Sequence, residues 1–353
     1  MKHTIFGESH GPAIGVVLEG VPSGVELDLE QIGFELSRRA PGKDALSTPR
    51  KEADIPEILS GCFEGNTTGT PLCAIIRNTD TRSRDYSKTK DLARPGHGDY
   101  PGFMRYQGYN DYRGGGHFSG RLTAPLVFAG AVAKQILAAE GIGIVAHIKS
   151  IAGVEDLPFQ NDKYDLDNEL VNTLPHKAFP VLEDEKGEEM KAAILAAKGD
   201  RDSVGGVIEC AVLGLPAGMG APDFGENVEG IVSQHMFAVP GVKAIGFGDG
   251  FGIANLRGSQ ANDPLYVRSG MVVSPTNHSG GVNGGITNGL PLLFEVALRP
   301  TASIAQEQDT NNLDAWTDEK LTIEGRHDPC IVHRAVPVIE AAAALAVCQL
   351  MGI

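Results

Sequence analysis

Two short loops place a histidine between glycines, and histidine is the side chain that most readily exchanges a proton near neutral pH. One loop reads Gly7-Glu8-Ser9-His10-Gly11, and the other reads Arg94-Pro95-Gly96-His97-Gly98-Asp99-Tyr100. In the second loop the arginine can bind a phosphate or carboxylate through two hydrogen bonds, and the aspartate can orient the imidazole. Both histidines are candidates for acid–base chemistry, although a loop histidine taken alone is more often an ordinary surface residue.

A third loop has the features of an anion-binding site. The run Tyr112–Arg121 contains three consecutive glycines, Ser119 and two arginines, and it leads directly into an apolar stretch. Backbone N–H groups and the positive end of the helix dipole favour anions at such a position. The chain has no GxxxxGKS or GxxxxGKT loop, and Gly246–Gly250 lacks the spacing of a dinucleotide fingerprint. Nucleotide hydrolysis and Rossmann-type binding are therefore disfavoured.

Two more loops follow predicted strands near the C-terminus. The segment Arg299–Ser303 supplies an arginine and two hydroxyl groups, and Gly325–Cys330 contains Asp328, whose carboxylate could act as a base. Asp328 precedes a proline, where aspartate is more often a simple turn former. Glycine pairs at 280–281 and 284–285 would let the backbone approach a ligand closely, or would simply form tight turns.

The elements that must hold these loops alternate between strands and helices. Residues 13–19 form an apolar run bounded by glycines, which predicts a strand. Asp28 can cap a helix that continues to Arg39 and is stopped by Pro41-Gly42. The polar segments 41–54 and 79–112 have little periodic apolar content, so we interpret them as loops of the site. Further helices are predicted over 126–139, 188–197 and 337–351, and further strands over 204–215, 243–247 and 290–298.

Composition restricts the class of protein. The chain has 353 residues and a net charge of −15, which disfavours a general binder of nucleic acids or membrane surfaces. Its five cysteines lack CxxC spacing, so neither a disulfide framework nor a zinc site is indicated. The apolar stretch 122–140 is interrupted by Lys134 and predicts a buried helix, and the first residues do not resemble a secretion signal. We therefore expect one interwoven α+β domain in a reducing cytoplasm, away from membranes.

Seven motifs, in this order, resemble the chorismate synthase family: GESHG at 7–11, RRAPG at 38–42, RPGHGDY at 94–100, DYRGGG at 111–116, GDGF at 248–251, NHSGG at 277–281 and GRHDPC at 325–330. The resemblance runs nearly from end to end. It implies a single domain over residues 1–353 with the family's β-α-β sandwich, in which helices lie between antiparallel sheets, and assembly as a homotetramer. It also implies the family's reaction in the shikimate pathway of aromatic amino acid biosynthesis. In that reaction reduced FMN supports the 1,4-anti elimination of phosphate from 5-enolpyruvylshikimate-3-phosphate, giving chorismate without net redox change.

The resemblance further implies roles for individual residues. His10 would protonate the departing phosphate, His97 would protonate the reduced flavin, and Asp328 would work with the flavin in removing the ring hydrogen. The implied substrate contacts are Arg39, Arg94 and Arg121. The implied FMN contacts are His117, Phe118, Ser119, Gly284, Arg299, Pro300, Thr301, Ala302, Ser303 and Arg326. No metal is implied, and the reduced FMN would come from a separate reductant, with NADPH acting only indirectly through a reductase.

The chain departs from the family pattern in three places. Lys43-Asp44-Ala45 stands where many members carry a second arginine, which Arg50 or Lys51 would replace, and His117-Phe118-Ser119 stands where many have Arg-Ser-Ser. The start before GESHG is also shorter than is common. Two other functions stay open: a different flavoenzyme acting on phosphorylated substrates, and a non-catalytic protein that binds FMN or phosphate. A binding protein would keep its affinity when His10, His97 and Asp328 are neutralised, whereas an enzyme would lose turnover.

Overall fold

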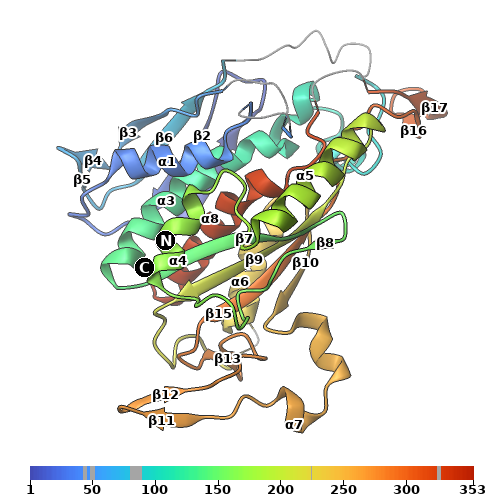
Figure 1. The fold of residues 1–353 in the computed structure, drawn as a ribbon. Coiled ribbons are helices and arrows are strands. Elements are labelled where there is room, and N and C mark those ends of the chain that lie inside the picture. The colour runs from blue at the N-terminus through green and yellow to red at the C-terminus, as the bar shows by residue number, and fades with distance from the viewer. Residues whose placement is uncertain (43–45, 48–51, 80–89, 224, 324–326) are drawn as a thin grey trace.

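Two antiparallel sheets enclose a layer of helices, which confirms the predicted α+β sandwich (Figure 1). The computed structural model describes residues 1–42, 46–47, 52–79, 90–223, 225–323 and 327–353. The four-stranded sheet has the order β1 (Lys2–Gly7), β2 (Ala13–Glu19), β6 (Leu72–Arg77) and β3 (Pro56–Ser60). The five-stranded sheet has the order β10 (Val242–Phe247), β15 (Leu292–Leu298), β9 (Gly206–Leu213), β7 (Gly143–Ile151) and β8 (Val154–Glu155). The helices between them are α1 (Leu29–Arg39), α3 (Thr123–Ala139), α6 (Val228–Phe237) and α8 (Val332–Leu350).

Alternating apolar residues turn one face of each sheet toward this helical layer. Ile14, Val16 and Leu18 of β2 are fully buried and belong to the main core, and β2 packs on α3. In the other sheet, Ile208 and Cys210 of β9 are buried in the same core, and β9 packs on α8. Successive side chains of a strand point to opposite faces, so this period of two directs both sheets at the same helices.

Close contact between α3 and α8 forms the centre of the layer. Gly130 of α3 lies so near Ala341 of α8 that a β-carbon at Gly130 would be 2.2 Å from the β-carbon of Ala341. Both helices are long and apolar enough by composition to cross a membrane, but 78% of the window in Gly120–Ala139 and 89% of that in Val332–Leu350 is buried inside the fold. They are core helices, as predicted for residues 122–140.

The predicted elements agree best with the structure where local signals are strong. β2 and α1 have the predicted bounds, and the Asp28 carboxylate caps α1 by accepting the N–H of Gln31 at 2.9 Å. The predicted start of the last helix at Pro337 is wrong, because α8 begins at Val332 and contains this proline. Proline is best tolerated at a helix start, but here the helix is almost wholly buried, and tertiary packing extends it past the lost hydrogen bond.

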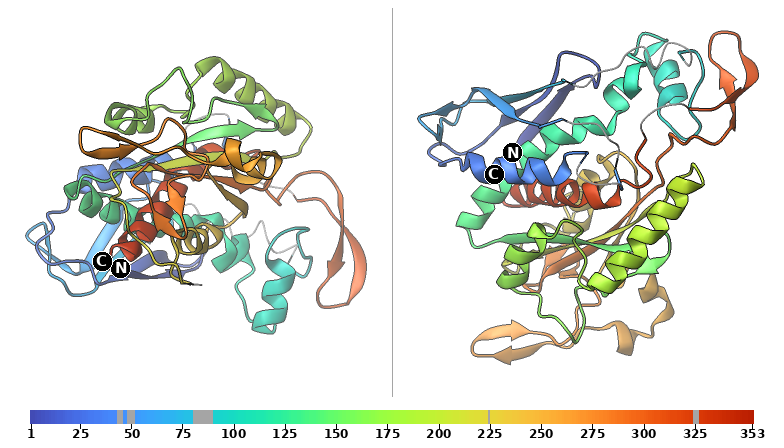
Figure 2. Two further views of the ribbon diagram at one scale, coloured as in Figure 1. Left: turned by 90° about the horizontal axis from the view of Figure 1, so that it is seen from below. Right: turned by 45° about the horizontal axis from the view of Figure 1, so that its top comes forward.

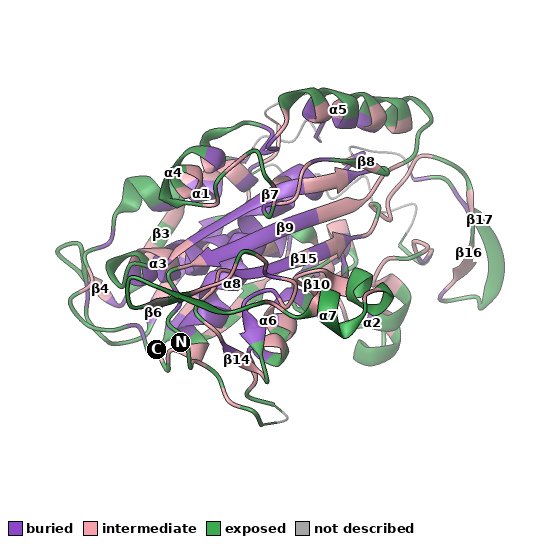
Figure 3. Cartoon of the chain, turned by 60° about the horizontal axis from the view of Figure 1, so that its bottom comes forward, coloured by how far each residue is buried: buried purple, intermediate pink, exposed green. Residues whose placement is uncertain are grey.

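Smaller elements surround the sandwich (Figures 2 and 3). The polar segment 79–112, predicted as loop, contains α2 (Asp99–Tyr106). Residues 250–276 form an arm that extends away from the body. The remaining α-helices and strands of the described residues are α4 (Asn168–Thr173), α5 (Asp184–Gly199), α7 (Gly258–Ala261) and the hairpins β4–β5 (Cys62–Phe63, Asn66–Thr67), β11–β12 (Tyr266–Arg268, Met271–Val273), β13–β14 (Val282–Asn283, Ile286–Thr287) and β16–β17 (Gln308–Asn312, Thr317–Leu321).

Candidate active site

A cavity of about 830 Å³ lies where the C-terminal end of α1 and the N-terminal ends of α3 and α8 meet the loops before α2 and after β15. This volume is near the upper end of the range for small-molecule sites, about 300–1,000 Å³. The basic side chains that line it are Arg39, Lys90, Arg94, Arg121, Lys243, Arg299 and Arg334. Five acidic residues line it as well, namely Glu52, Asp91, Asp99, Asp314 and Asp328, so among the described residues basic side chains exceed acidic ones by seven to five. In a chain of net charge −15, this local excess of positive charge favours an anionic ligand.

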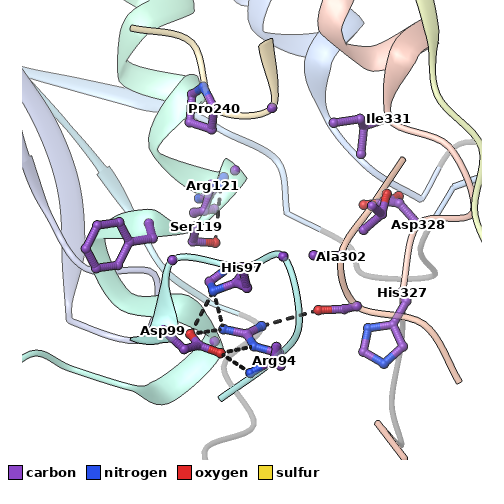
Figure 4. Close-up of a pocket in the computed structure, with 18 of the residues that line it drawn as sticks. Arg94, His97, Asp99, Ser119, Arg121, Pro240, Ala302, His327, Asp328 and Ile331 are labelled. Atoms are coloured by element: carbon purple, nitrogen blue, oxygen red, sulfur yellow. Dashed lines mark hydrogen bonds and ion pairs between the residues drawn. The ribbon is translucent and has the colours of Figure 1, made fainter. Parts of the chain in front are cut away.

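Most of the predicted site residues line this one cavity. They are Arg39, Arg94, His97, Phe118, Ser119, Arg121, Arg299, Pro300, Thr301, Ala302, Ser303 and Asp328. Figure 4 shows the group formed by Arg94, His97 and Asp99 on one side, and His327, Asp328 and Ile331 on another. Residues predicted from five segments of the sequence therefore line one cavity.

Three predicted residues do not line the cavity. His10 lies behind Gly114, and His117 is exposed, with its Nδ1 donating to the carbonyl of Gly7 at 3.0 Å. Gly284 lies in the β13–β14 hairpin. The FMN contact predicted at Arg326 falls outside the described residues, as do Arg50 and Lys51.

In the glycine loop 114–116, Gly114 packs against His10 and Gly115 against His97, the two predicted catalytic histidines, while Gly116 packs against the carbonyl of Asp111. All three have positive φ angles, of 60°, 87° and 52°. A β-carbon at Gly114 would lie 2.2 Å from Cε1 of His10, and one at Gly115 would lie 3.0 Å from Cε1 of His97. Only glycine combines this backbone with so close an approach, so the glycine loop is what allows His10 and His97 each to pack against the backbone here.

The His10 ring is held by its neighbour Ser9. The Ser9 hydroxyl oxygen lies 3.1 Å from Nδ1 of His10 and 3.2 Å from the carbonyl oxygens of Arg113 and Gly114. These carbonyl oxygens only accept, so the hydroxyl proton can go to one of them, and Nδ1 of His10 then donates to the Ser9 oxygen. The other ring nitrogen, Nε2, is buried.

Arg39 and Arg121 share one buried carboxylate, that of Asp54. Arg39 binds it through Nε at 3.1 Å and through Nη2, and Arg121 binds it through Nη1. The side chains of Arg39, Asp54 and Arg121 are 4%, 0% and 6% exposed. Burial alone would raise the pKa of Asp54, but the two guanidinium groups outweigh it and lower that pKa below its ordinary value. Sequence reasoning missed Asp54, because it lies in a polar loop without a motif.

Asp328 likewise has a fixed partner, Arg334 in the first turn of α8. Nη1 of Arg334 lies 2.9 and 2.8 Å from the two carboxylate oxygens of Asp328, and its Nε donates to the carbonyl of Arg39 at 3.0 Å. Arg334 was also missed. The sequence signal was an arginine shortly after the GRHDPC motif, but placing the helix start at Pro337 left Arg334 in an unassigned loop.

Gly114→Ala is expected to lower turnover at least tenfold, because the new methyl group would displace the His10 ring. The matched control is Gly141→Ala: Gly141 also has a positive φ, of 77°, but a β-carbon there meets no atom within 4 Å. Both changes strain the backbone by about 1 kcal/mol, so the difference in turnover at equal folded fraction measures the contact with His10. Equal turnover in the two variants would contradict the proposed contact.

Comparison with known proteins gives one consistent family. The sequence profile described as chorismate synthase matches residues 1–351. Chorismate synthase of Lancefieldella parvula is 43% identical over 356 residues, covering 98% of this chain and 93% of that protein. Chorismate synthase of Thermococcus kodakarensis is 44% identical over 348 residues, covering 98% and 94%. A crystal structure of chorismate synthase is similar in fold, with a TM-score of 0.77 and 29% identity, over 99% of this chain and 91% of that one.

Proposed function

Since the chain belongs to the chorismate synthase family, we propose that it is the lyase that eliminates phosphate from 5-enolpyruvylshikimate-3-phosphate to form chorismate, with reduced FMN as cofactor. The observation that carries the proposal is the cavity itself. It gathers basic side chains, His97 and Asp328 in one place, with His10 directly behind the glycine loop. A substrate with a phosphate and two carboxylates matches that charge.

The residues of the cavity fit FMN. The hydroxyl oxygen of Thr301 is buried, and no described residue forms a hydrogen bond with it. The hydrogen bonds found for Arg299 in the described part of the chain go to the carbonyls of Gly96 and Pro300 and to no carboxylate. The Thr301 hydroxyl and the Arg299 guanidinium can therefore both bind a phosphate group. Pro240 and Ile331 add apolar lining, which suits a flat ring system. When bound, reduced FMN supplies electron density that stabilises the substrate ring as its C–O bond breaks.

Residues of the chain itself bind the substrate and transfer the protons. Arg39 and Arg121 bind and orient the anionic groups of the substrate, held in place beforehand by Asp54. His10 gives a proton to the phosphate, which leaves with the electrons of the C–O bond, and Ser9 fixes the ring that donates it. Asp328, oriented by Arg334, takes up the ring hydrogen as a proton, so that the products carry no net oxidation or reduction.

The direct test is anaerobic phosphate release, together with chorismate absorbance, from purified protein, substrate and chemically reduced FMN. We expect turnover with reduced FMN and none with oxidised FMN. The variants His10→Ala, His97→Ala and Asp328→Asn are each expected to lower turnover by about 10²- to 10⁴-fold while FMN still binds. Folded protein that binds FMN but releases no phosphate would refute the proposal and favour a binding protein or a different substrate.

We propose a homotetramer in the cytoplasm and a separate source of reduced FMN as the setting of this reaction. Family membership supports the proposed assembly. The family profile matches residues 1–351, so this stretch is accounted for by the synthase, which supports a reductant on another protein. Light scattering of the purified protein tests the assembly. A coupled assay with NADPH tests the reductant: we expect turnover only when a flavin reductase is added.

A further inference from the structure

His97 has two ring nitrogens, and the structure distinguishes them by their neighbours. We propose that Asp99 is a positioning residue that fixes Nδ1 of His97 as a hydrogen-bond donor, so that His97 exchanges protons with a ligand only through Nε2. The effect of this on turnover rests on the proposed function, whereas the assignment of the ring nitrogens does not.

Two charged groups lie beside Nδ1 of His97, one that accepts hydrogen bonds and one that donates them. It lies 2.7 Å from Oδ1 of Asp99 and 3.0 Å from Nη2 of Arg94. A carboxylate oxygen only accepts and a guanidinium nitrogen only donates, so Nδ1 can satisfy just one of them. Nη2 of Arg94 already has Oδ1 of Asp99 at 2.8 Å as its acceptor, and the contact from Nδ1 to Asp99 is the shorter one. The proton of the neutral ring therefore belongs on Nδ1.

The second nitrogen, Nε2, lies beside the glycine loop, in a residue that lines the cavity. A β-carbon at Gly115 would lie 3.2 Å from it, and His97 is among the residues that line the cavity. Among the described residues, none forms a hydrogen bond with Nε2. The neutral ring presents a lone pair there and the charged ring presents an N–H, so a proton can pass in either direction through this atom alone.

Asp99 is itself rigidly held and ionised. Arg94 donates to it from Nε at 2.7 Å and from its backbone N–H at 3.1 Å. Burial alone would raise the pKa of Asp99, but hydrogen bonds from Arg94 and His97 outweigh it and keep that pKa well below its ordinary value. Asp99 begins α2, and the ring of Phe118 packs so tightly on this helix that a β-carbon at Gly102 would be 2.5 Å from it. The acceptor for Nδ1 is therefore a fixed carboxylate.

Asp99→Asn tests the proposal, because asparagine has the same shape but can donate its amide N–H to Nδ1. The measurement is the nitrogen NMR spectrum of the ligand-free protein labelled with ¹⁵N-histidine, recorded where the imidazoles are neutral, with His97→Gln to identify the signals. We expect Nδ1–H in the parent and Nε2–H in the variant. We also expect a loss of turnover of about a hundredfold, with the FMN dissociation constant changed less than about threefold.

Asp249→Asn is the spectral control. Nδ1 of His278 lies 2.7 Å from Oδ2 of Asp249, which is the same type of contact outside this cavity. The ¹⁵N signals of His278 in Asp249→Asn therefore give the spectral change expected when an Asp–His hydrogen bond is lost. A parent protein with Nε2–H at His97 overturns the proposal, and this spectrum decides even if Asp99→Asn does not fold. A change of tautomer without loss of turnover overturns the positioning role. A parent that makes no chorismate refutes the proposed function and leaves the nitrogen assignment standing.

Discussion

Asp54→Asn is expected to lower the free energy of unfolding by about 3 kcal/mol, because it removes the buried counter-charge that Arg39 and Arg121 share and, among the described residues, leaves Arg121 with the carboxylate of Glu52 alone. The two arginines would also lose their fixed orientation, so kcat/KM for the phosphorylated substrate should fall about a hundredfold in the folded fraction. Asparagine is the suitable replacement, since Asp54 has a φ of 50° and asparagine tolerates this region well. Urea unfolding and steady-state kinetics measure the two effects.

Ligand addition separates the two consequences of this change. A saturating phosphorylated substrate places new negative charge beside Arg39 and Arg121, so it should raise the melting temperature of Asp54→Asn more than that of the parent. An unchanged unfolding free energy, together with unchanged kinetics, would show that Asp54 does not hold these arginines in solution.

Glu340→Gln is expected to lower the free energy of unfolding by a similar amount, about 3–5 kcal/mol, but to leave the turnover of folded protein unchanged. Glu340 is fully buried on α8 and accepts hydrogen bonds from Arg38, Lys134 and the backbone N–H of Ala146. These contacts join α1, α3 and β7 to the central helix, away from the cavity lining. Urea unfolding gives the stability, and turnover at low temperature gives the activity.

The stability that Glu340 provides should depend on pH in a defined direction. Burial alone would raise its pKa, but Arg38 and Lys134 outweigh burial and lower that pKa from 4.5 to about 2. The folded protein thus binds this proton less readily than the unfolded chain, so the contribution is present above pH 4.5 and is lost as the pH falls toward 2. The difference in unfolding free energy between the parent and Glu340→Gln should therefore shrink over this window.

The two carboxylate variants serve as controls for each other. Both remove one charge from a buried ion pair, but only Asp54 contacts predicted substrate arginines. We therefore expect a loss of stability in both and a loss of kcat/KM per folded molecule in Asp54→Asn alone. Equal losses of activity would mean that general loosening of the helical layer, and not the orientation of Arg39 and Arg121, explains the kinetics.

The ion pairs around the cavity all hold predicted site residues in place before a ligand binds. Arg39 and Arg121 are held by Asp54, Arg94 by Asp99, and Asp328 by Arg334, before any ligand is present. Groups fixed in advance need not reorganise as charge develops during a reaction, which is the main source of electrostatic stabilisation in enzymes. The same carboxylates partly neutralise the arginines that a ligand would contact. The affinity for an anionic ligand should therefore depend more on side chains such as Arg299, whose hydrogen bonds in the described part of the chain go to carbonyl oxygens and not to a carboxylate.

Local sequence signals determined the elements whose causes are local. The period of two in Ala13–Glu19 and the cap at Asp28 each depend on residues a few positions apart, and both elements have their predicted bounds. The order of seven motifs determined the family and the sandwich fold, which the comparisons support. It also indicated that His97, Asp328 and the arginines serve one site, and these residues line one cavity.

Only the tertiary structure decided which charges share a partner. Asp54 and Arg121 are 67 residues apart in sequence, so no periodicity could pair them. Arg334 meets Asp328 because α8 starts at Val332, and that start depends on burial of the helix between the sheets, which overrides the usual effect of Pro337. The need for glycine at 114 and 115 likewise follows from the rings of His10 and His97, which only the fold brings against that loop. Long-range contacts of this kind are set by packing, which a sequence read locally does not specify.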